Sequence, residues 1–175
     1  ICFDNRGHGR SGKPHGVRYY GIEMAEDVVR LMDHLGLPRA HVIGYSMGGF
    51  ITLKLLAEHP ERLLSAAPCG AGWERRDADG MARLESIAAA IEERGDYGPL
   101  LSEVGVRNRG LGRLKVFVMN RFFRYINEDD QVIADVVRSL PELEVEEAAL
   151  RANGVPVLSI AGAADPLKRG VDNMA

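Results

Sequence analysis

Residues 41–49 read His41-Val42-Ile43-Gly44-Tyr45-Ser46-Met47-Gly48-Gly49. The run begins with residues that favour β-strands and passes into the pattern Gly-x-Ser-x-Gly, with one more glycine directly behind it. Residues 50–59 follow as a mostly apolar segment that Pro60 closes, as expected for a buried helix. The order strand, tight turn, helix predicts that Ser46 stands at the tip of the turn.

A serine at such a turn is suited to nucleophilic chemistry. Glycines beside it remove Cβ atoms that would clash in a tight turn, and the hydroxyl is pushed into the open. The following helix points its first N–H groups and the positive end of its dipole at the same place. We therefore predict Ser46 as a nucleophile and the Met47 backbone N–H as an oxyanion-hole donor. The alternative is an ordinary glycine-rich turn with a surface serine, which this context disfavours.

The composition is that of an ordinary globular domain. The chain has 175 residues, 46% hydrophobic and 27% charged, with a net charge of −3, which gives no global reason to expect a nucleic acid or an anionic membrane as partner. No apolar run of 18 residues occurs, so we expect no membrane span. Cys2 and Cys69 lie in or beside apolar runs, and we expect two buried thiols in a reducing, cytoplasmic compartment.

Residues 4–14 form a loop rich in glycine, serine and proline. The spacing of its glycines matches neither GxGxxG nor a Walker A pattern, so we expect no nucleotide site there. His8 in this loop is interpreted as a loop-packing or solvent-facing residue. The sequence predicts no cofactor and no metal.

Hydrophobic spacing predicts a helix over 22–35 and strands over 42–45 and 62–68. This alternation indicates a mostly parallel sheet with crossover helices. From about residue 70 to residue 150 the pattern changes to five amphipathic helices without a clear strand, and the sheet resumes over 155–161. Asp165 follows that last strand directly, at the edge where open α/β sheets bind their ligands.

Four pieces of the chain, in order, resemble the α/β-hydrolase fold, in the serine-nucleophile branch that includes esterases and lipases. They are the loop Asp4-x-Arg6-Gly7-x-Gly9-x-Ser11, the helix segment Ala25-Glu26-Asp27-Val28, the turn at 44–49 and the segment 155–165. The resemblance implies Ser46 as the nucleophile and Asp165 as the acid of a catalytic triad. It also implies that residues 70–150 are a helical lid inserted between two parts of the core, 1–69 and 151–175.

The base of the triad is where this chain departs from the family, whose order is serine, acid, histidine. All five histidines precede Asp165: His8, His15, His34, His41 and His59. None can be carried over, so we expect the base beyond residue 175 and the first oxyanion loop before residue 1. Asp165 can also be interpreted as a turn-forming aspartate before Pro166. Asp77 and Asp79, which follow the previous strand, are competing carboxylates.

The chain begins in what looks like a strand, residues 1–3, without an initiator methionine, and it stops at 171–175 without a closing element. We interpret it as an internal fragment whose parent's N-terminus, with any signal peptide, is not seen. A fragment of this kind leaves strand edges uncovered, and exposed edges invite association. We expect these 175 residues alone to be prone to aggregation and hydrolytically inactive.

The residues of the expected lid give information about the substrate. Its large apolar residues either line an acyl pocket or form the core of the lid: Trp73, Phe117, Met119, Phe122, Phe123 and Tyr125. Its basic residues either attract an anionic substrate or are neutralised by the acids that follow them. The basic residues are Arg107, Arg109, Arg113, Lys115, Arg121 and Arg124, and the acids are Glu128, Asp129, Asp130, Asp135, Glu142, Glu144, Glu146 and Glu147.

The sequence thus predicts a serine hydrolase for a small-molecule carboxylic ester, or a related acyl or lactone substrate with an apolar acyl part, through an acyl-enzyme on Ser46. C–C bond hydrolases and cofactor-free perhydrolases share this scaffold and remain alternatives, as does a non-catalytic protein that binds a small ligand. Epoxide hydrolases and haloalkane dehalogenases are disfavoured because they use a carboxylate where this chain has Ser46. A nucleic-acid partner is not expected, and the oligomeric state is left open.

Overall fold

The structure, a computed structural model, describes residues 1–73, 75–105, 111–126 and 129–174, without the side chains at 111–113, 124 and 126. The chain divides into two compact units. Unit 1 consists of Ile1–Tyr20 and Arg76–Pro141, and unit 2 consists of Gly21–Arg75 and Glu142–Ala175. The expected lid bounds of 70–150 remain a prediction about how these pieces are used in the whole protein.

Unit 2 is built on a parallel pair of strands, β1 (Ala40–Tyr45) and β2 (Leu63–Cys69). Residues 155–161 lie along the other edge of β2 through single parallel bridges, Ala66 with Val157 and Cys69 with Ile160. The expected parallel sheet is therefore confirmed, although its third member is held by isolated bridges. Residues 1–3, which the sequence suggested as a strand, form no regular structure.

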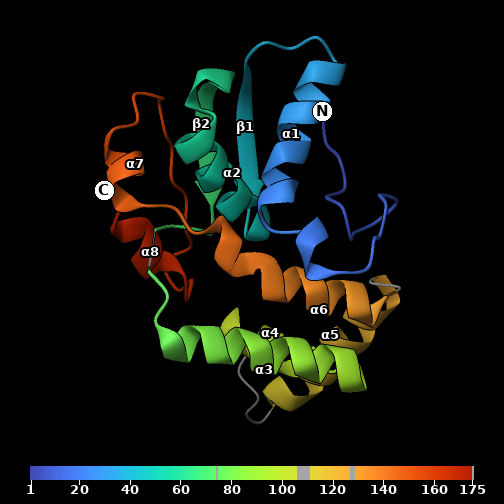
Figure 1. The fold of residues 1–175 in the computed structure, drawn as a ribbon. Coiled ribbons are helices and arrows are strands. Elements are labelled where there is room, and N and C mark those ends of the chain that lie inside the picture. The colour runs from blue at the N-terminus through green and yellow to red at the C-terminus, as the bar shows by residue number, and fades with distance from the viewer. Residues whose placement is uncertain (74, 106–110, 127–128, 175) are drawn as a thin grey trace. The chain divides into compact units, whose positions relative to one another are not determined.

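The helices of unit 2 are α1 (Ile22–His34), α2 (Met47–Glu58), α7 (Glu147–Arg151) and α8 (Lys168–Asp172), with a 3₁₀ turn η2 at Pro60–Arg62. Helix α1 is amphipathic, and its buried residues are Met24, Ala25, Val28, Val29 and Met32. Helix α2 is buried from Ile51 to Leu56, because it lies on the strands and also contacts α1 (Figure 1). Because Ser46 directly precedes α2, the packing of α2 on the strands and on α1 positions it.

Unit 1 contains α3 (Ala78–Arg94), α4 (Gly98–Glu103), α5 (Leu111–Ile126) and α6 (Asp130–Ser139), with a 3₁₀ turn η1 at Val17–Tyr19. A further 3₁₀ turn, η3 (Leu140–Leu143), spans the boundary between the two units. Side-chain caps begin two of these helices: Asp77 accepts from Gly80 N at 2.8 Å and Asp129 accepts from Val132 N at 3.2 Å. The core of the unit lies mainly between α3 and α6 and consists of Ile87, Ala88, Ile91, Tyr97, Ile133, Ala134 and Val137. The five helices expected after residue 70 are all present, the fifth being α7 in unit 2.

The N-terminal loop belongs to unit 1 because it is bonded to α6. Gly16 N donates to the buried carboxylate of Asp135 at 2.7 Å, and the Tyr20 hydroxyl donates to Pro14 O at 2.6 Å. Gly7, at φ +83°, packs against Tyr20 and α6 with no room for a Cβ. Burial, together with the nearby Asp135 carboxylate, raises the pKa of Tyr20 to about 12. The loop is thus a structural connection to α6.

Two expectations about burial were wrong. Cys2 is exposed and Cys69 is half-buried, and both are free thiols. Cys2 is exposed because residues 1–5 pair with no strand in the described part of the chain. Ile43 and Tyr45 are also exposed, since β1 presents one face to α2 and no described element covers the other.

The large apolar residues of α5 do not all share one environment. Phe123 is half-buried and packs on Tyr97, with ring centroids 5.8 Å apart, as part of the core of unit 1. Phe117, Phe122 and Tyr125 are 67%, 56% and 83% exposed. The interpretation as lid core is therefore right for Phe123 and wrong for the other three, which point away from that core.

This difference predicts opposite stability effects at two adjacent residues. Phe123→Ala should lower the free energy of unfolding by about 2–3 kcal/mol, somewhat less than for a fully buried phenylalanine, because a cavity opens beside Tyr97. Phe122→Ala should change it by no more than about 0.5 kcal/mol, as for other exposed positions. Thermal melts of the two variants measure the contrast, and equal losses would contradict the described orientation of α5.

Candidate active site

Ser46 has a backbone conformation that few side chains adopt. Its φ is 54° and its ψ is −117°, and among the described residues it is the one non-glycine residue with a positive φ. Such a conformation costs on the order of 1–3 kcal/mol and persists only where the surroundings enforce it. Ser46 N donates to Cys69 O at 2.8 Å, and Ser46 O accepts from Gly49 N at 2.8 Å and Phe50 N at 3.2 Å. The turn is therefore fixed on one side by β2 and on the other by α2.

The glycines around Ser46 have separate functions. A Cβ on Gly44 would overlap the Gly48 carbonyl and the Thr52 hydroxyl, and a Cβ on Gly49 would lie 2.6 Å from the Cβ of Ala71. Both positions therefore require glycine because strand and helix approach closely. A Cβ on Gly48 would meet no atom within 4 Å. The expectation that both glycines of the motif relieve a clash holds for Gly44 and is wrong for Gly48.

The Ser46 side chain is not used to cap the helix. Ser46 is the N-cap residue of α2, yet its hydroxyl makes no capping hydrogen bond. The first N–H groups of a helix have no acceptor within the helix, and this includes the Met47 N–H. A hydroxyl and a backbone donor therefore occur together at the positive end of a 12-residue helix.

Asp165 lies at the same edge of the sheet. Its backbone N donates to Gly162 O at 3.0 Å, and its Oδ1 accepts from Leu167 N at 2.9 Å, so it does form the tight turn that its position before Pro166 suggests. Its Oδ2 faces Gly70, 3.4 Å from where a Cβ on that glycine would lie, and the Tyr45 ring borders the same space. One carboxylate oxygen holds the loop, and the other is directed toward the end of β2.

Two backbone hydrogen bonds bring these segments together. Ser46 N is bonded to Cys69 O, and Gly70 N is bonded to Ile160 O at 2.8 Å. The carboxyl ends of β1, β2 and residues 155–161 therefore meet at one edge, with Ser46 after the first and Asp165 after the third. The sequence pattern predicted this common edge, and the structure confirms it within unit 2.

A close backbone crossing that the sequence analysis missed supports the Asp165 loop. A Cβ on Gly72 would overlap the backbone of Gly170 and Val171, so the segment after β2 lies directly on α8. Asn173 Nδ2 donates to Trp73 O at 3.1 Å beside this crossing. Because α8 begins three residues after Asp165, the crossing fixes where that loop can lie. Glycines at 70, 72 and 170 were the available signal.

Most of the histidines and one of the two competing carboxylates have other partners. His8 and His15 belong to unit 1, where His15 Nε2 lies 2.8 Å from Asp129 Oδ2. In unit 2, His41 bonds Ser65 at 2.7 Å and His59 bonds Glu26 at 2.7 Å, while His34 is in the last turn of α1. Asp77 caps α3, and Asp79 is in its first turn. Among the described residues no histidine hydrogen-bonds to Ser46 or Asp165, and the base stays a prediction.

Two kinds of feature are absent from the described residues. No three histidine, cysteine, aspartate or glutamate side chains lie close enough together there to hold a metal ion. None of the described helices has the length and apolar character that crossing a membrane requires.

The chain belongs to the α/β hydrolase fold family, whose model matches residues 1–99. It is similar to RutD of Caulobacter vibrioides, named as a carbamate hydrolase, with 43% identity over 44% of this chain and 28% of that protein. It is 29% identical to 3-oxoadipate enol-lactonase 2 of Acinetobacter baylyi over 98% of this chain and 63% of that protein. A thermophilic esterase from Thermogutta terrifontis shares the fold, with a TM-score of 0.78, 22% identity and coverage of 98% and 65%.

The chain thus spans just under two thirds of the lactonase and of the esterase. The match to RutD, with 77 aligned residues, is more local. The order of strand, turn and helix around Ser46 agrees with this family, and the match to the fold of the esterase covers 98% of this chain.

The crossing of Gly72 with Gly170 predicts a specific defect. In the whole protein, Gly72→Ala should displace α8 and with it the Asp165 loop, lowering stability by about 2 kcal/mol or more. Gly154→Ala is the matched control, because its Cβ would meet nothing within 4 Å. The control should be neutral or slightly stabilising, by up to about 1 kcal/mol. Urea unfolding of both variants tests this, and a neutral Gly72→Ala would refute the crossing.

Proposed function

We propose that this chain carries the nucleophile and the acid of a serine hydrolase that acts on a carboxylic ester or lactone. The observation that carries the proposal is the backbone of Ser46, a non-glycine residue at φ 54° whose hydroxyl makes no capping bond at the N-terminus of α2. A conformation of this cost is expected where function requires it. Membership of the hydrolase family and the names of two relatives, a lactonase and an esterase, support the same reaction class.

The geometry suggests a role for each group. The Ser46 Oγ attacks the substrate carbonyl carbon as a base removes its proton, and the carbonyl oxygen becomes an oxyanion. The Met47 N–H, at the positive end of α2, stabilises that oxyanion. The base then gives its proton to the departing alkoxide, which leaves as the alcohol, and an acyl-enzyme forms on Ser46. Attack by water, with the same base, releases the acid and restores the serine.

Asp165 is proposed to orient the base. Its Oδ1 is held by Leu167 N, which fixes the loop, and its Oδ2 is directed toward the end of β2. A carboxylate in this position holds a histidine in the tautomer that accepts the serine proton and stabilises the imidazolium that results. The histidine itself is expected outside these 175 residues.

The substrate class follows from the carbonyl chemistry shared by the relatives. An enol-lactone, a carboxylic ester and a carbamate all present an sp² carbonyl carbon with an oxygen or nitrogen leaving group. The Ser46 hydroxyl is placed to attack that carbon, and the Met47 N–H is placed to stabilise the negative charge on its oxygen. We propose a small uncharged ester or lactone with an apolar acyl part as the preferred substrate.

Ser46→Ala tests the nucleophile. In the whole protein this change should reduce kcat for p-nitrophenyl acetate by at least about 10⁴-fold, because the attacking oxygen is lost. Its melting temperature should stay the same or rise, since the hydroxyl makes no capping bond to α2 and catalytic sites trade stability for function. Full esterase activity in this variant would refute the assignment and favour a non-catalytic binding protein.

Asp165→Asn tests the acid against its alternative as a turn residue. The asparagine keeps an oxygen for Leu167 N, so the fold should survive, but the base takes the wrong tautomer and kcat should fall by up to about 10⁴-fold. Asp172→Asn is the matched control, because Asp172 forms only an exposed ion pair with Lys168. If both variants keep full activity, Asp165 is a turn residue and the acid lies elsewhere.

A further inference from the structure

Helix α5 presents large apolar residues on two opposite faces. Its inward face carries Val116, Met119, Asn120 and Phe123, and Asn120 Oδ1 accepts from Tyr97 N at 3.0 Å. At about 3.6 residues per turn, five further residues share the outward face: Leu114, Phe117, Val118, Phe122 and Tyr125. All five are more than half exposed. We call these five residues the outer stripe of α5.

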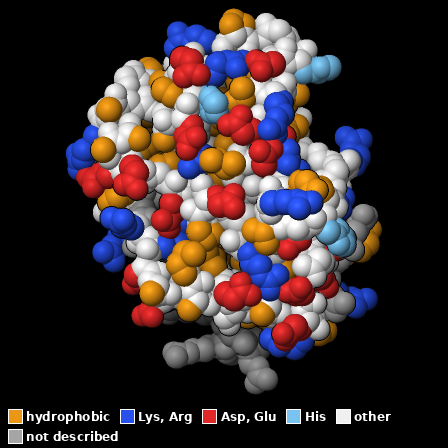
Figure 2. All heavy atoms as spheres, in the orientation of Figure 1, with side chains coloured by type: hydrophobic (Ala, Val, Ile, Leu, Met, Phe, Trp, Pro, Cys, Tyr) orange, Lys and Arg blue, Asp and Glu red, His pale blue; other side chains and the backbone are white. Residues whose placement is uncertain are grey.

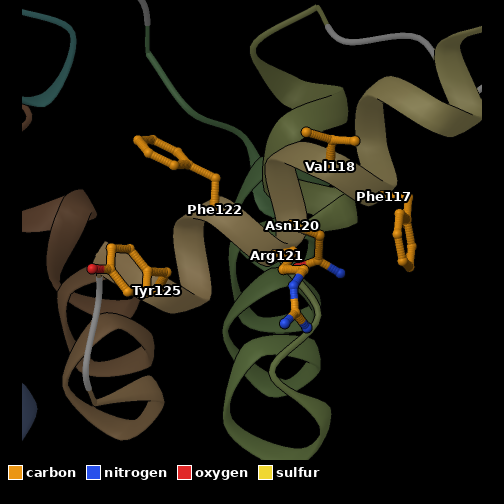
Figure 3. A pocket seen from close by; sticks show the side chains of 6 residues that line it. All are labelled: Phe117, Val118, Asn120, Arg121, Phe122 and Tyr125. Atoms are coloured by element: carbon orange, nitrogen blue, oxygen red, sulfur yellow. The ribbon is translucent and has the colours of Figure 1, made fainter.

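A hollow lies beside the outer stripe. The described residues that border this hollow all come from α5. Figure 3 shows Val118 and Phe122 extending on one side of the helix and Phe117 and Arg121 on the other. An apolar stripe along a helix of 16 residues, about 24 Å long, is long enough to contact an extended surface.

The charged residues in the sequence of α5 are of one sign. No aspartate or glutamate occurs from residue 104 to residue 127, and Lys115 and Arg121 are exposed beside the stripe. Within the described part of the chain neither cation has a carboxylate within ion-pair distance. Elsewhere, Figure 2 shows acidic and basic side chains interspersed over the face in view. The positive character of α5 is therefore a local feature.

Four of the acids that follow α5 in the sequence have partners outside α5. Asp129 caps α6 and lies 2.8 Å from His15, and Asp135 accepts from Gly16 N. Glu142 accepts from Ile22 N at 3.3 Å, and Glu147 forms an ion pair with Arg151. These four acids therefore do not neutralise the basic residues of α5, although this had been expected. Arg107, Arg109 and Glu128 lie outside the described residues.

From this arrangement we infer that the outer stripe docks on an anionic lipid surface. An interfacial helix needs an exposed apolar face, aromatic residues at the boundary, and basic side chains whose alkyl stems lie along the apolar surface while their charges reach the headgroups. Phe117, Phe122 and Tyr125 supply the first two, and Lys115 and Arg121 supply the third. Anionic headgroups complement the charge, and acyl chains complement the apolar residues.

A second copy of the chain is a poorer occupant of this surface. Two copies related by a two-fold axis would place the same patch against itself, so Lys115 and Arg121 of one copy would face basic residues of the other. Like charges that face each other at such an interface raise the free energy of the complex. The opposite charges of an anionic lipid surface would lower it. The inference is independent of the proposed reaction, because it concerns only residues of α5.

Vesicle flotation of the whole protein tests the inference. We expect binding to vesicles of phosphatidylcholine with phosphatidylglycerol at low salt and much weaker binding to phosphatidylcholine alone or at high salt. Phe117→Ser with Phe122→Ser should reduce partitioning at least about tenfold, because two exposed rings no longer enter the interface. Lys115→Gln with Arg121→Gln should reduce it about fivefold per charge, for the anionic vesicles only.

A control separates this surface from other exposed apolar residues. Met81→Ser on α3 changes an exposed position outside the stripe and should leave partitioning unchanged. Absence of binding to anionic vesicles at low salt would overturn the inference, as would equal losses for control and stripe variants. A dimer that Phe122→Ser abolishes, seen by sedimentation in protein without vesicle binding, would overturn it in favour of a second copy.

Discussion

The hydrogen bond from Ser46 N to Cys69 O is the interaction on which the site depends. It fixes the last residue before α2 to the last residue of β2, while Ser46 O accepts the first bonds of the helix. Between these constraints the backbone of Ser46 has no relaxed conformation available and stays at φ 54°. The close contacts at Gly44 and Gly49 let strand and helix approach closely enough for both sets of bonds. Strain at one residue is thus offset by packing at several others.

The same end of β2 connects the site to the second part of unit 2. Gly70 N bonds Ile160 O one residue after Cys69 O receives Ser46 N, and Gly72 then crosses Gly170. Within four residues the chain therefore makes contact with both the Ser46 turn and the Asp165 loop. Substitutions in this segment should affect the geometry between nucleophile and acid although none of its side chains takes part in the proposed chemistry.

The turn at Ser46 could be predicted from its own residues. The parallel pairing of β1 with β2 and the position of Asp165 at their carboxyl edge followed from the general rule that parallel strands joined by crossovers end at one edge of a sheet. The contact of Gly72 with Gly170 could not be predicted in this way, since it joins segments about a hundred residues apart. The division of α5 also escaped prediction. Phe122 and Phe123 are adjacent and chemically identical, and only the position of Tyr97 decides which one is packed. Cys2 was expected to be buried because its neighbours are apolar, yet burial requires a paired strand.

The two units differ in what their surfaces offer. Unit 2 contains the strained serine and the carboxylate at one sheet edge, and unit 1 contains a helix with an unburied apolar face and basic neighbours.

The central claim is that Ser46 in unit 2 is the nucleophile. The most direct test is to treat the whole protein with a fluorophosphonate probe and to map the modified peptide by mass spectrometry. The account predicts one modified residue, Ser46, and no labelling of Ser46→Ala. An unlabelled Ser46 in a protein that hydrolyses esters would contradict it.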